Sequence, residues 1–306
     1  MNQSRTTGLL LALVTACISG VSVFVNGYGV KHFASATTYT TAKNLVAAVL
    51  LLLVVSAVAP RRGLVTRPST ARSRWGLLAI ALVGGSIPFI LFFEGLSRAT
   101  SVQTAFLQKT LVVWVALLAI PLLGEKIGAW HWGALGLLVV GQAALTGATT
   151  GPLHIRWGSG EVMVLAATLL WSVEVVIAKR LLAELSSWTI GVARMVLGSL
   201  LLVGWAVVRG NAGQLVHLSG GQMTWVLVTG LLLGAYVATW FAALAKAQAV
   251  DVTAVLVVGA VITALLSALV KGTPLQPQLG GLGLVLAGTA VLVWRMAAGP
   301  RPVAAT

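Results

Sequence analysis

The sequence is poor in charged residues. Only 8% of its 306 residues are Asp, Glu, Lys or Arg, whereas 58% are hydrophobic, and a soluble domain normally carries about 25% charged residues. A surface that faces water on all sides cannot be made from this composition, so we predict a membrane protein. The apolar runs are continuous, as in LVAAVLLLLVVSAVA (residues 45–59). They lack the period-two alternation of an outer-membrane barrel, which favours helical spans.

Acidic residues, cysteine and histidine are also scarce. Six Asp and Glu stand against 20 Lys and Arg, which gives a formal charge of +14. In a membrane protein such an excess is typical of cytoplasmic loops, so it does not indicate nucleic-acid binding. The one cysteine excludes an internal disulfide and a thiolate metal cluster. The four histidines are dispersed at loops or span ends, and we expect neither a metal nor a cofactor.

Recognisable catalytic and channel motifs are missing from the sequence. It has no HExxH, no paired intramembrane aspartates, no Ser/His/Asp set and no Gly-rich nucleotide loop. We therefore predict that the protein is not an enzyme. A filter-like motif or pore ring is missing too, which disfavours a channel.

The single cysteine ends the run VTAC at Cys17, which resembles a bacterial lipoprotein cleavage site. The apolar run continues beyond it, whereas a cleaved signal peptide has an apolar core of about 7–15 residues. We interpret this segment as a first spanning helix.

Apolar runs between charged, Pro or Gly breaks are long enough for ten spanning helices, because about 20 apolar residues cross a bilayer as a helix. The predicted spans are residues 8–30, 36–58, 75–97, 100–121, 129–148, 160–180, 187–208, 222–244, 249–270 and 279–297. The predicted fold class is therefore an all-α membrane protein with ten transmembrane helices.

The distribution of Lys and Arg predicts the orientation, because cytoplasmic loops are enriched in them. With the N-terminus inside, 12 basic residues fall inside and 5 outside. The inside group is Arg5, Arg61, Arg62, Arg67, Arg72, Arg74, Lys126, Lys179, Arg180, Lys246, Arg295 and Arg301, and the outside group is Lys31, Arg98, Arg156, Arg209 and Lys271. We expect a multi-pass protein of the inner (plasma) membrane with both termini in the cytoplasm.

The two halves of the chain resemble each other. FEGLSRATSVQTAFLQKTLVVWVALLAIPLLG (93–124) aligns with FAALAKAQAVDVTAVLVVGAVITALLSALVKG (241–272) at a shift of 148 residues. AKNLVAAVLLLLV (42–54) aligns with ARMVLGSLLLVGW (193–205) at a shift of 151 residues. The alignment indicates an internal repeat.

Matched cations support this repeat more strongly than Leu identities, which arise by chance. Arg98 coincides with Lys246, and Lys43 coincides with Arg194. Each half would hold five spans, an odd number, so the halves would enter the membrane in opposite orientation. Such an inverted 5+5 repeat is a transporter architecture with its site near the midplane. We predict two repeats, at residues 8–148 and 160–297.

The stretch AFLQKTLVVWVALLAIPLLGEKIGAWHWGALGLLVVG (105–141), with its Gly124–Glu125 corner, resembles the fourth and fifth helices of the EamA domains of the drug/metabolite transporter superfamily. In the second half, Trp171 resembles the Trp of the family's first helix, Lys179 follows it by eight residues as in the family, and Arg194 resembles the Arg of the next helix. The resemblance covers about residues 8–297. It implies a ten-helix secondary transporter without a cofactor, usually an exporter of amino acids, metabolites or drugs.

The chain departs from the family pattern at three positions. The family often has Pro in its fourth and ninth helices, where this chain has Val112 and Ala260. The corner Glu is replaced by Thr273 in the second half. These differences leave open whether the two helices are kinked and how the second corner is built.

Four ionisable residues lie within predicted spans, where charged groups are costly and mark functional sites by default. They are Lys43, Lys109, Glu174 and Arg194. At 1.5 Å per residue, Glu174 and Arg194 lie ~9 and ~10 Å from the inner ends of sequential spans. We expect them to pair, either as a buried ion pair that joins the helices or as a proton or substrate site.

The other two cations have no matching acid. Lys43 lies ~10 Å from the outer end of its span, so it either reaches the headgroups or binds substrate. Lys109 lies ~14 Å from an outer end, close to the midplane, and we expect it to face a water-filled cavity. Three cations and one carboxylate in the spans would attract an anion. A substrate carboxylate or phosphate would complete the site, and the alternative is a neutral Lys109 that takes part in proton coupling.

Polar and aromatic neighbours support a cavity near these charges. Ser101, Thr104 and Gln108 share one helical stripe beside Lys109. Aromatic residues usually anchor a span at the membrane interface, but three lie in mid-span and are candidates for stacking on a flat or apolar substrate. These are Trp171, Tyr236 and Trp240. Pro88 is expected to kink the third span.

These observations predict a secondary exporter of amino acids or related small carboxylate-bearing metabolites that works by alternating access. Its expected partners are a small-molecule substrate and the lipid bilayer, without nucleic acid, and a homodimer is allowed. Two alternatives stay open. One is a proton-coupled drug exporter with Glu174 as its central carboxylate, and the other is an antiporter of phosphorylated or nucleotide-linked sugars.

Overall fold

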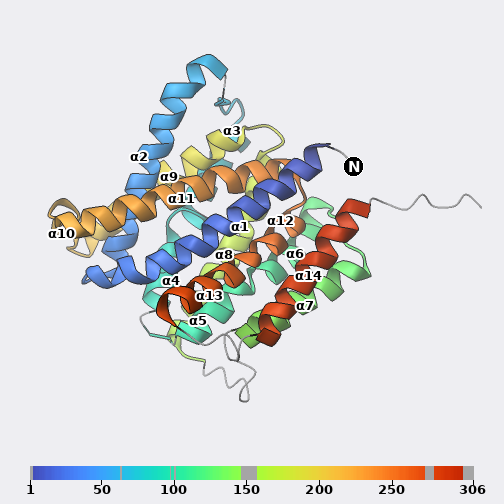
Figure 1. Cartoon of the computed structure of the whole chain (residues 1–306). Coiled ribbons are helices and arrows are strands. Elements are labelled where there is room, and N and C mark those ends of the chain that lie inside the picture. Colours follow the sequence, from blue (N-terminus) through green and yellow to red (C-terminus); the bar gives the residue numbers. More distant parts are fainter. Residues whose placement is uncertain are drawn as a thin grey trace, which may run out of the picture.

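The computed structural model describes residues 3–62, 64–96, 98–99, 101–145, 157–272 and 279–298. The elements in chain order are α1 (Gln3–Gly29), η1 (Val30–His32), α2 (Ala36–Arg62), α3 (Ala71–Val83), α4 (Ile87–Leu96), α5 (Ser101–Lys109), α6 (Leu111–Leu123), α7 (Ala129–Leu145), α8 (Ser159–Leu181), α9 (Ser187–Val208), α10 (Ala212–Val216), α11 (Gly220–Lys246), α12 (Ala249–Leu256), α13 (Val258–Lys271) and α14 (Leu279–Ala298). The described part of the chain is helical, with no strand, as Figure 1 shows. The predicted all-α class is confirmed.

The helices correspond to the predicted spans. Within the described residues, eight helical stretches are long and apolar enough to cross a membrane. Two shorter apolar helices, Ala129–Leu145 and Leu279–Leu292, stand where the fifth and tenth spans are predicted. Thr273 and Arg156, and the side chain of Ser101, lie outside the described residues.

The third span is interrupted where two glycines precede a proline. Helix α3 ends at Val83 and α4 begins at Ile87, so the interruption lies before Pro88, which occupies the first turn of α4. A proline is tolerated there because the first N–H groups of a helix have no intrahelical partner. Gly85 lies against α9, and a Cβ added to Gly198 would lie 2.7 Å from the Cα atom of Gly85. The absence of side chains at both positions allows the backbones to meet.

The fourth and ninth spans are interrupted too, at equivalent positions. Helix α5 ends at Lys109, and the repeat shift of 148 residues places Val257, between α12 and α13, at the matching position. Neither break contains a proline. At the first break the Thr110 hydroxyl donates to the Leu107 carbonyl at 2.6 Å and accepts from the Trp114 indole N–H at 3.0 Å. Such back-bonding competes with the helical ladder and bends helices.

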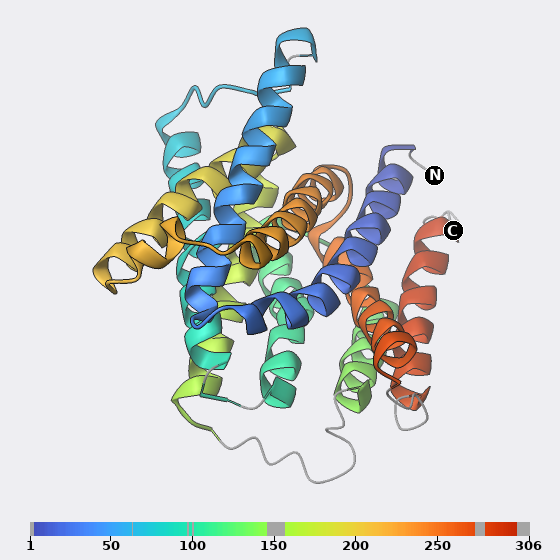
Figure 2. The same cartoon turned by 60° about the vertical axis from the view of Figure 1, so that its left-hand side comes forward.

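Helices of the two halves pack directly on each other. Helix α1 lies along α11 and α13, α7 lies along α14, and α8 contacts α4 and α6. Figure 2 shows the start of α1 and the end of α14 on the same side of the bundle. We call this side, which also holds the ends of α8 and α11, the terminal end.

Candidate functional site

A cavity of about 380 Å³ lies among helices of both halves of the chain. It is lined by side chains from α1, α2, α4, α5, α6, α8, α9, α11 and α12. Its volume falls within the range of small-molecule sites, about 300–1,000 Å³. The lining includes most of the sequence-predicted site residues: Lys43, Gln108, Lys109, Trp171, Glu174, Arg194, Tyr236 and Trp240.

Two predicted residues do not line the cavity. Thr104 is 2% exposed on α5, one turn before Gln108, and its hydroxyl has no hydrogen-bond partner among the described residues. Pro88 is buried in the first turn of α4, next to the lining residue Phe89. Both residues are therefore buried outside the cavity lining.

Lys109 is the last residue of α5 and lies at the break of the fourth span. Its side chain is half-buried, and its ammonium group has no hydrogen-bond or ion-pair partner among the described residues. The next helix, α6, begins at Leu111, and both Leu111 and Val112 line the cavity. The N-terminal, positive end of the α6 dipole thus follows directly after Lys109 in the chain. Both features favour an anion at this point.

Lys43 is buried in α2 and points to a neutral partner. Its Nζ donates to the Asn26 amide oxygen at 2.9 Å, and it lies 5.2 Å from the Tyr39 ring centroid and 5.7 Å from that of Phe93. The same amide oxygen accepts from the Tyr39 hydroxyl at 2.7 Å. The ammonium group therefore turns into the cavity wall instead of towards the headgroups. No carboxylate neutralises it among the described residues.

Glu174 and Arg194 form an ion pair between α8 and α9. The Arg194 Nε donates to Glu174 Oε1, and the Arg194 Nη2 also donates to the Gly84 carbonyl at 3.1 Å. Both residues are at most 7% exposed, so the pair is desolvated and held at both of its carboxylate oxygens. The pair links three spans, because Gly84 belongs to the break between α3 and α4.

The aromatic residues form two separate groups on the wall. The Trp171 indole donates to the Gly84 carbonyl at 3.2 Å and packs against Phe89 and Phe92, with ring centroids 5.5 and 5.6 Å away. Tyr236 and Trp240 stack with centroids 5.9 Å apart and an interplanar angle of 11°. Gly84 therefore anchors both an aromatic residue and the Arg194 guanidinium.

The cavity has an excess of positive charge. Its Lys, Arg, Asp and Glu side chains are three cations and one carboxylate, and the carboxylate is already paired with Arg194. Lys43 and Lys109 are left without a counter-ion, which makes the cavity attractive to an anionic group. Among the described residues, no group of three or more His, Cys, Asp and Glu is placed to hold a metal ion.

Sequence reasoning missed Asn26 and the phenylalanines of α4. Asn26 is polar within an apolar span, and it shares one face of α1 with Ser19 and Ser22, which also line the cavity. The spacing of i, i+3 and i+7 is a signal that could have identified this face. The phenylalanines carry no such signal, because an apolar span contains aromatic residues for many reasons.

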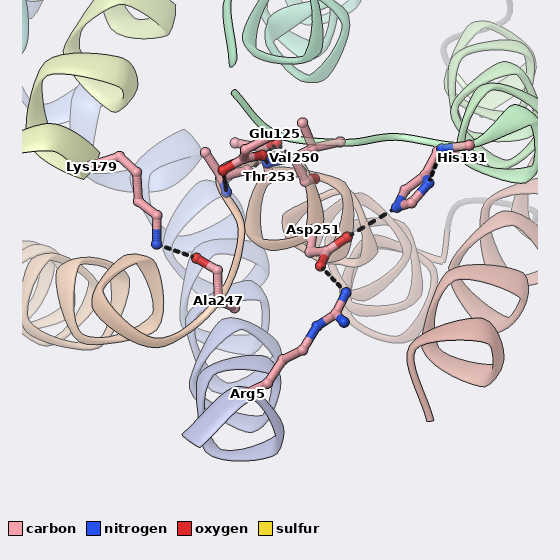
Figure 3. A network of polar contacts seen from close by, with 10 residues as sticks. Arg5, Glu125, His131, Lys179, Ala247, Val250, Asp251 and Thr253 are labelled. Carbon is pink, nitrogen blue, oxygen red and sulfur yellow. Dashed lines mark hydrogen bonds and ion pairs between the residues drawn. The ribbon is translucent and has the colours of Figure 1, made fainter. Parts of the chain in front are cut away.

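A polar network joins the two halves at the terminal end (Figure 3). Glu125 accepts from the N–H groups of Ala249 and Val250 at 2.6 and 3.1 Å, so it caps the start of α12. Lys179 donates to the Leu244 and Ala247 carbonyls, both at 2.6 Å, and caps the end of α11. Burial raises the pKa of the Glu125 carboxyl group above its ordinary value, although the two N–H groups oppose this shift.

Asp251 lies at the centre of the same network. It is fully buried, its Oδ2 accepts from Arg5 Nη2 at 2.9 Å, and its Oδ1 lies 3.6 Å from His131 Nε2. Asp251 and His131 were not predicted as site residues, because both stand at the ends of predicted spans. Only the packing of α1, α7 and α12 brings them together.

Comparison with known proteins agrees with this architecture. The model of the EamA-like transporter family matches residues 6–147 and 158–294. An uncharacterized transporter encoded in the cobO 3′ region of Sinorhizobium sp. is 27% identical over 135 residues, which cover 44% of this chain and 91% of that protein. One solved structure, a crystal structure of a protein, shares the fold with a TM-score of 0.77 at 16% identity and covers 95% of this chain and 98% of its own. The chain belongs to the EamA-like transporter family and is a membrane transporter.

Proposed function

We propose that this transporter exports amino acids or related small carboxylate-bearing metabolites by alternating access. One observation carries the proposal: Lys43 and Lys109 line the cavity without an acidic partner, while Glu174 is tied to Arg194. A substrate carboxylate would supply the missing negative charge. Alternating access fits the inverted repeat, in which two halves rock around a site near the midplane.

The geometry supports a specific placement of the substrate carboxylate. Lys109 and the first turn of α6 meet at the break of the fourth span. In transporters with broken helices, the N-terminal ends of half-helices point at anionic substrate groups. The remaining body of the substrate would lie against Trp171 and the Tyr236–Trp240 stack, which offer flat apolar surfaces.

We propose that the protein lies in the inner (plasma) membrane. In the proposed orientation, both termini are in the cytoplasm. The terminal end carries Arg5, Lys179, Arg180 and Lys246 on neighbouring helices. Basic residues of this kind are typical of the cytoplasmic side.

Counterflow in proteoliposomes tests the substrate class. Vesicles loaded with unlabelled amino acids are expected to accumulate a labelled amino acid, and Lys109→Gln is expected to reduce the initial rate at least tenfold. Arg98→Gln serves as the control, because Arg98 is half-exposed and pairs with Glu94 away from the cavity wall. Equal rates for Lys109→Gln and the unmodified protein would contradict the proposal.

A phosphate-bearing substrate is the second candidate, because two uncompensated cations suit a phosphate as well as a carboxylate. Exchange with inorganic phosphate or a nucleotide-linked sugar, without exchange of amino acids, would support an antiporter of phosphorylated or nucleotide-linked sugars. Drug export is less well supported, because Glu174 is occupied by Arg194 and is not free for a cationic drug.

A further inference from the structure

The chain contains six acidic side chains, and only one of them lines the cavity. This one is Glu174, and Arg194 binds both of its carboxylate oxygens. The others lie outside the lining: Glu94, Glu125, Glu161, Glu184 and Asp251. Because all six belong to the described part of the chain, no acidic side chain is left in the cavity to pair with a cationic group of the substrate.

The Asn26 amide, which lines the cavity, is also fully used as an acceptor. Its oxygen accepts from the Tyr39 hydroxyl at 2.7 Å and from the Lys43 ammonium at 2.9 Å. An amide oxygen has two lone pairs, so no capacity is left for a third donor. The Asn26 Nδ2 donates to the carbonyl and hydroxyl oxygens of Ser22 at 2.6 and 3.0 Å. A substrate ammonium group therefore finds no acceptor on this amide.

Aromatic rings of the wall attract cations through their faces, and the rings around the buried cations are already used in this way. The Lys43 Nζ lies 5.2 Å from the ring centroid of Tyr39 and 5.7 Å from that of Phe93. The guanidinium carbon of Arg194 lies 5.8 Å from the ring centroid of Phe89. These rings stabilise the protein's own cations, and a substrate cation would have to compete with them.

The remaining aromatic surfaces suit the apolar part of a substrate. Trp171 and the stacked Tyr236 and Trp240 line the cavity with large flat side chains. A flat apolar group that covers these rings removes them from an ammonium group of the same molecule. Gln108 and Ser19 offer only neutral oxygens. The described lining thus has places for a carboxylate and for a flat apolar body, but no free negative charge for an amine.

The two uncompensated lysines discriminate between an anion and a zwitterion. The ammonium group of an amino acid is attached to the carbon next to the carboxylate, so it would be carried towards the lysine that binds the carboxylate. Like charges brought together in a binding site weaken binding. A zwitterion also brings no net charge, and it leaves the positive charge of Lys43 and Lys109 as it was. A carboxylate without the amine brings a net negative charge and does not meet this repulsion.

We propose that the preferred substrate of this cavity is a flat, hydrophobic carboxylic acid without an ammonium group, such as a 2-oxo or 2-hydroxy acid with an aromatic side chain. Asn26 sets this preference by being neutral, and Arg194 sets it by occupying Glu174. The inference rests on the proposed export of carboxylates and narrows it, because zwitterionic amino acids become the weaker substrates.

Three ligands with the same ring test the preference on the purified protein. They are 3-phenyllactate, phenylalanine and phenethylamine, which at neutral pH are an anion, a zwitterion and a cation. The first two differ only by a hydroxyl in place of the ammonium group. In isothermal titration calorimetry, 3-phenyllactate is expected to bind at least about tenfold more tightly than phenylalanine, because repulsion by the lysines is absent. Phenethylamine is expected to bind more weakly than both. Competition against labelled 3-phenyllactate in counterflow should give the same order.

The variant Asn26→Asp tests the part of the neutral amide. A carboxylate at this position would neutralise Lys43, so the affinity for the anion falls while that for the zwitterion does not. The preference for 3-phenyllactate over phenylalanine is expected to fall about tenfold. If this variant does not fold, Lys109→Gln carries the test, since it also removes an uncompensated charge and should lower the preference. Arg98→Gln, outside the lining, should keep the preference of the unmodified protein.

Phenylalanine that binds as tightly as 3-phenyllactate, or more tightly, would overturn the inference. A preference that both Asn26→Asp and Lys109→Gln leave unchanged would overturn it too. Exchange of amino acids without exchange of 3-phenyllactate would reject this inference and leave the proposed function standing. If neither amino acids nor 3-phenyllactate are exchanged, the proposed export of carboxylates itself fails. The two failures therefore give different results in the same assay.

Discussion

The Lys43 ammonium donates to the Asn26 amide oxygen at 2.9 Å, so a neutral side chain holds a buried cation in the cavity wall. An amide orients the ammonium without cancelling its charge. If the cavity selects anions through its uncompensated lysines, its affinity for an anionic substrate depends on a neutral residue at position 26 as well as on the positive charge of Lys43.

The variant Asn26→Asp tests this relationship. A carboxylate at this position would pair with Lys43 and remove one of the two free positive charges. The KM for an anionic substrate in counterflow is expected to rise about tenfold, which corresponds to about 1.4 kcal/mol. Asn26→Gln keeps the amide neutral and is the control. An unchanged KM for Asn26→Asp would show that Lys43 does not contribute its charge to substrate binding.

The contact between Gly85 and Gly198 gives a prediction about stability. A Cβ at position 198 would lie 2.7 Å from the Cα and carbonyl oxygen of Gly85, which is closer than real Cβ atoms approach backbone. Gly198→Ala is therefore expected to destabilise the protein by about 1–3 kcal/mol through overpacking. Gly204 lies on the same helix with open space around its Cβ position. Gly204→Ala should leave the thermal unfolding midpoint in detergent unchanged or raise it, and equal effects of the two changes would contradict the close approach.

The buried pair of Glu174 and Arg194 gives a second prediction about stability. Removing one partner leaves an uncompensated buried charge, and Glu174→Gln or Arg194→Met is expected to cost about 3–5 kcal/mol. Replacing both by neutral residues of similar size, as in Glu174→Gln with Arg194→Met, should restore most of the loss. Thermal unfolding of the three variants checks this. If the double variant is as unstable as the sum of the single ones, the pair does not act as a unit.

Much of the fold could be predicted from the sequence because apolar length is a local property. Runs of about 20 apolar residues specify spanning helices whatever their neighbours are. Lys109 could be assigned to the cavity for the same reason, since an ammonium group near the midplane needs water or a polar wall. The breaks in the fourth and ninth spans could not be predicted, because Val112 and Ala260 replace the prolines that would have indicated them.

The network at the terminal end escaped prediction for a different reason. Asp251 and His131 stand 120 residues apart in the sequence, at the ends of their helices, where a charged residue is unremarkable. Asp251 is buried and lies 3.6 Å from His131 only because α1, α7 and α12 pack together. No periodicity within one helix carries that information.

Glu125 gives a prediction about the pH dependence of stability. Burial raises the pKa of this carboxyl group above its ordinary value, so the folded protein binds the proton more tightly than the unfolded chain does. The resulting stabilisation is fully present below the ordinary pKa of a glutamate, and it is lost as the pH rises through the raised pKa of the folded state. Between the ordinary pKa of a glutamate and the raised pKa of folded Glu125, the thermal unfolding midpoint should therefore fall as the pH rises. The fall should be larger in the unmodified protein than in Glu125→Gln. The amide of Glu125→Gln keeps one acceptor for the N–H groups of Ala249 and Val250 but does not titrate. If both proteins show the same pH profile of the unfolding midpoint, the burial of Glu125 does not govern its protonation.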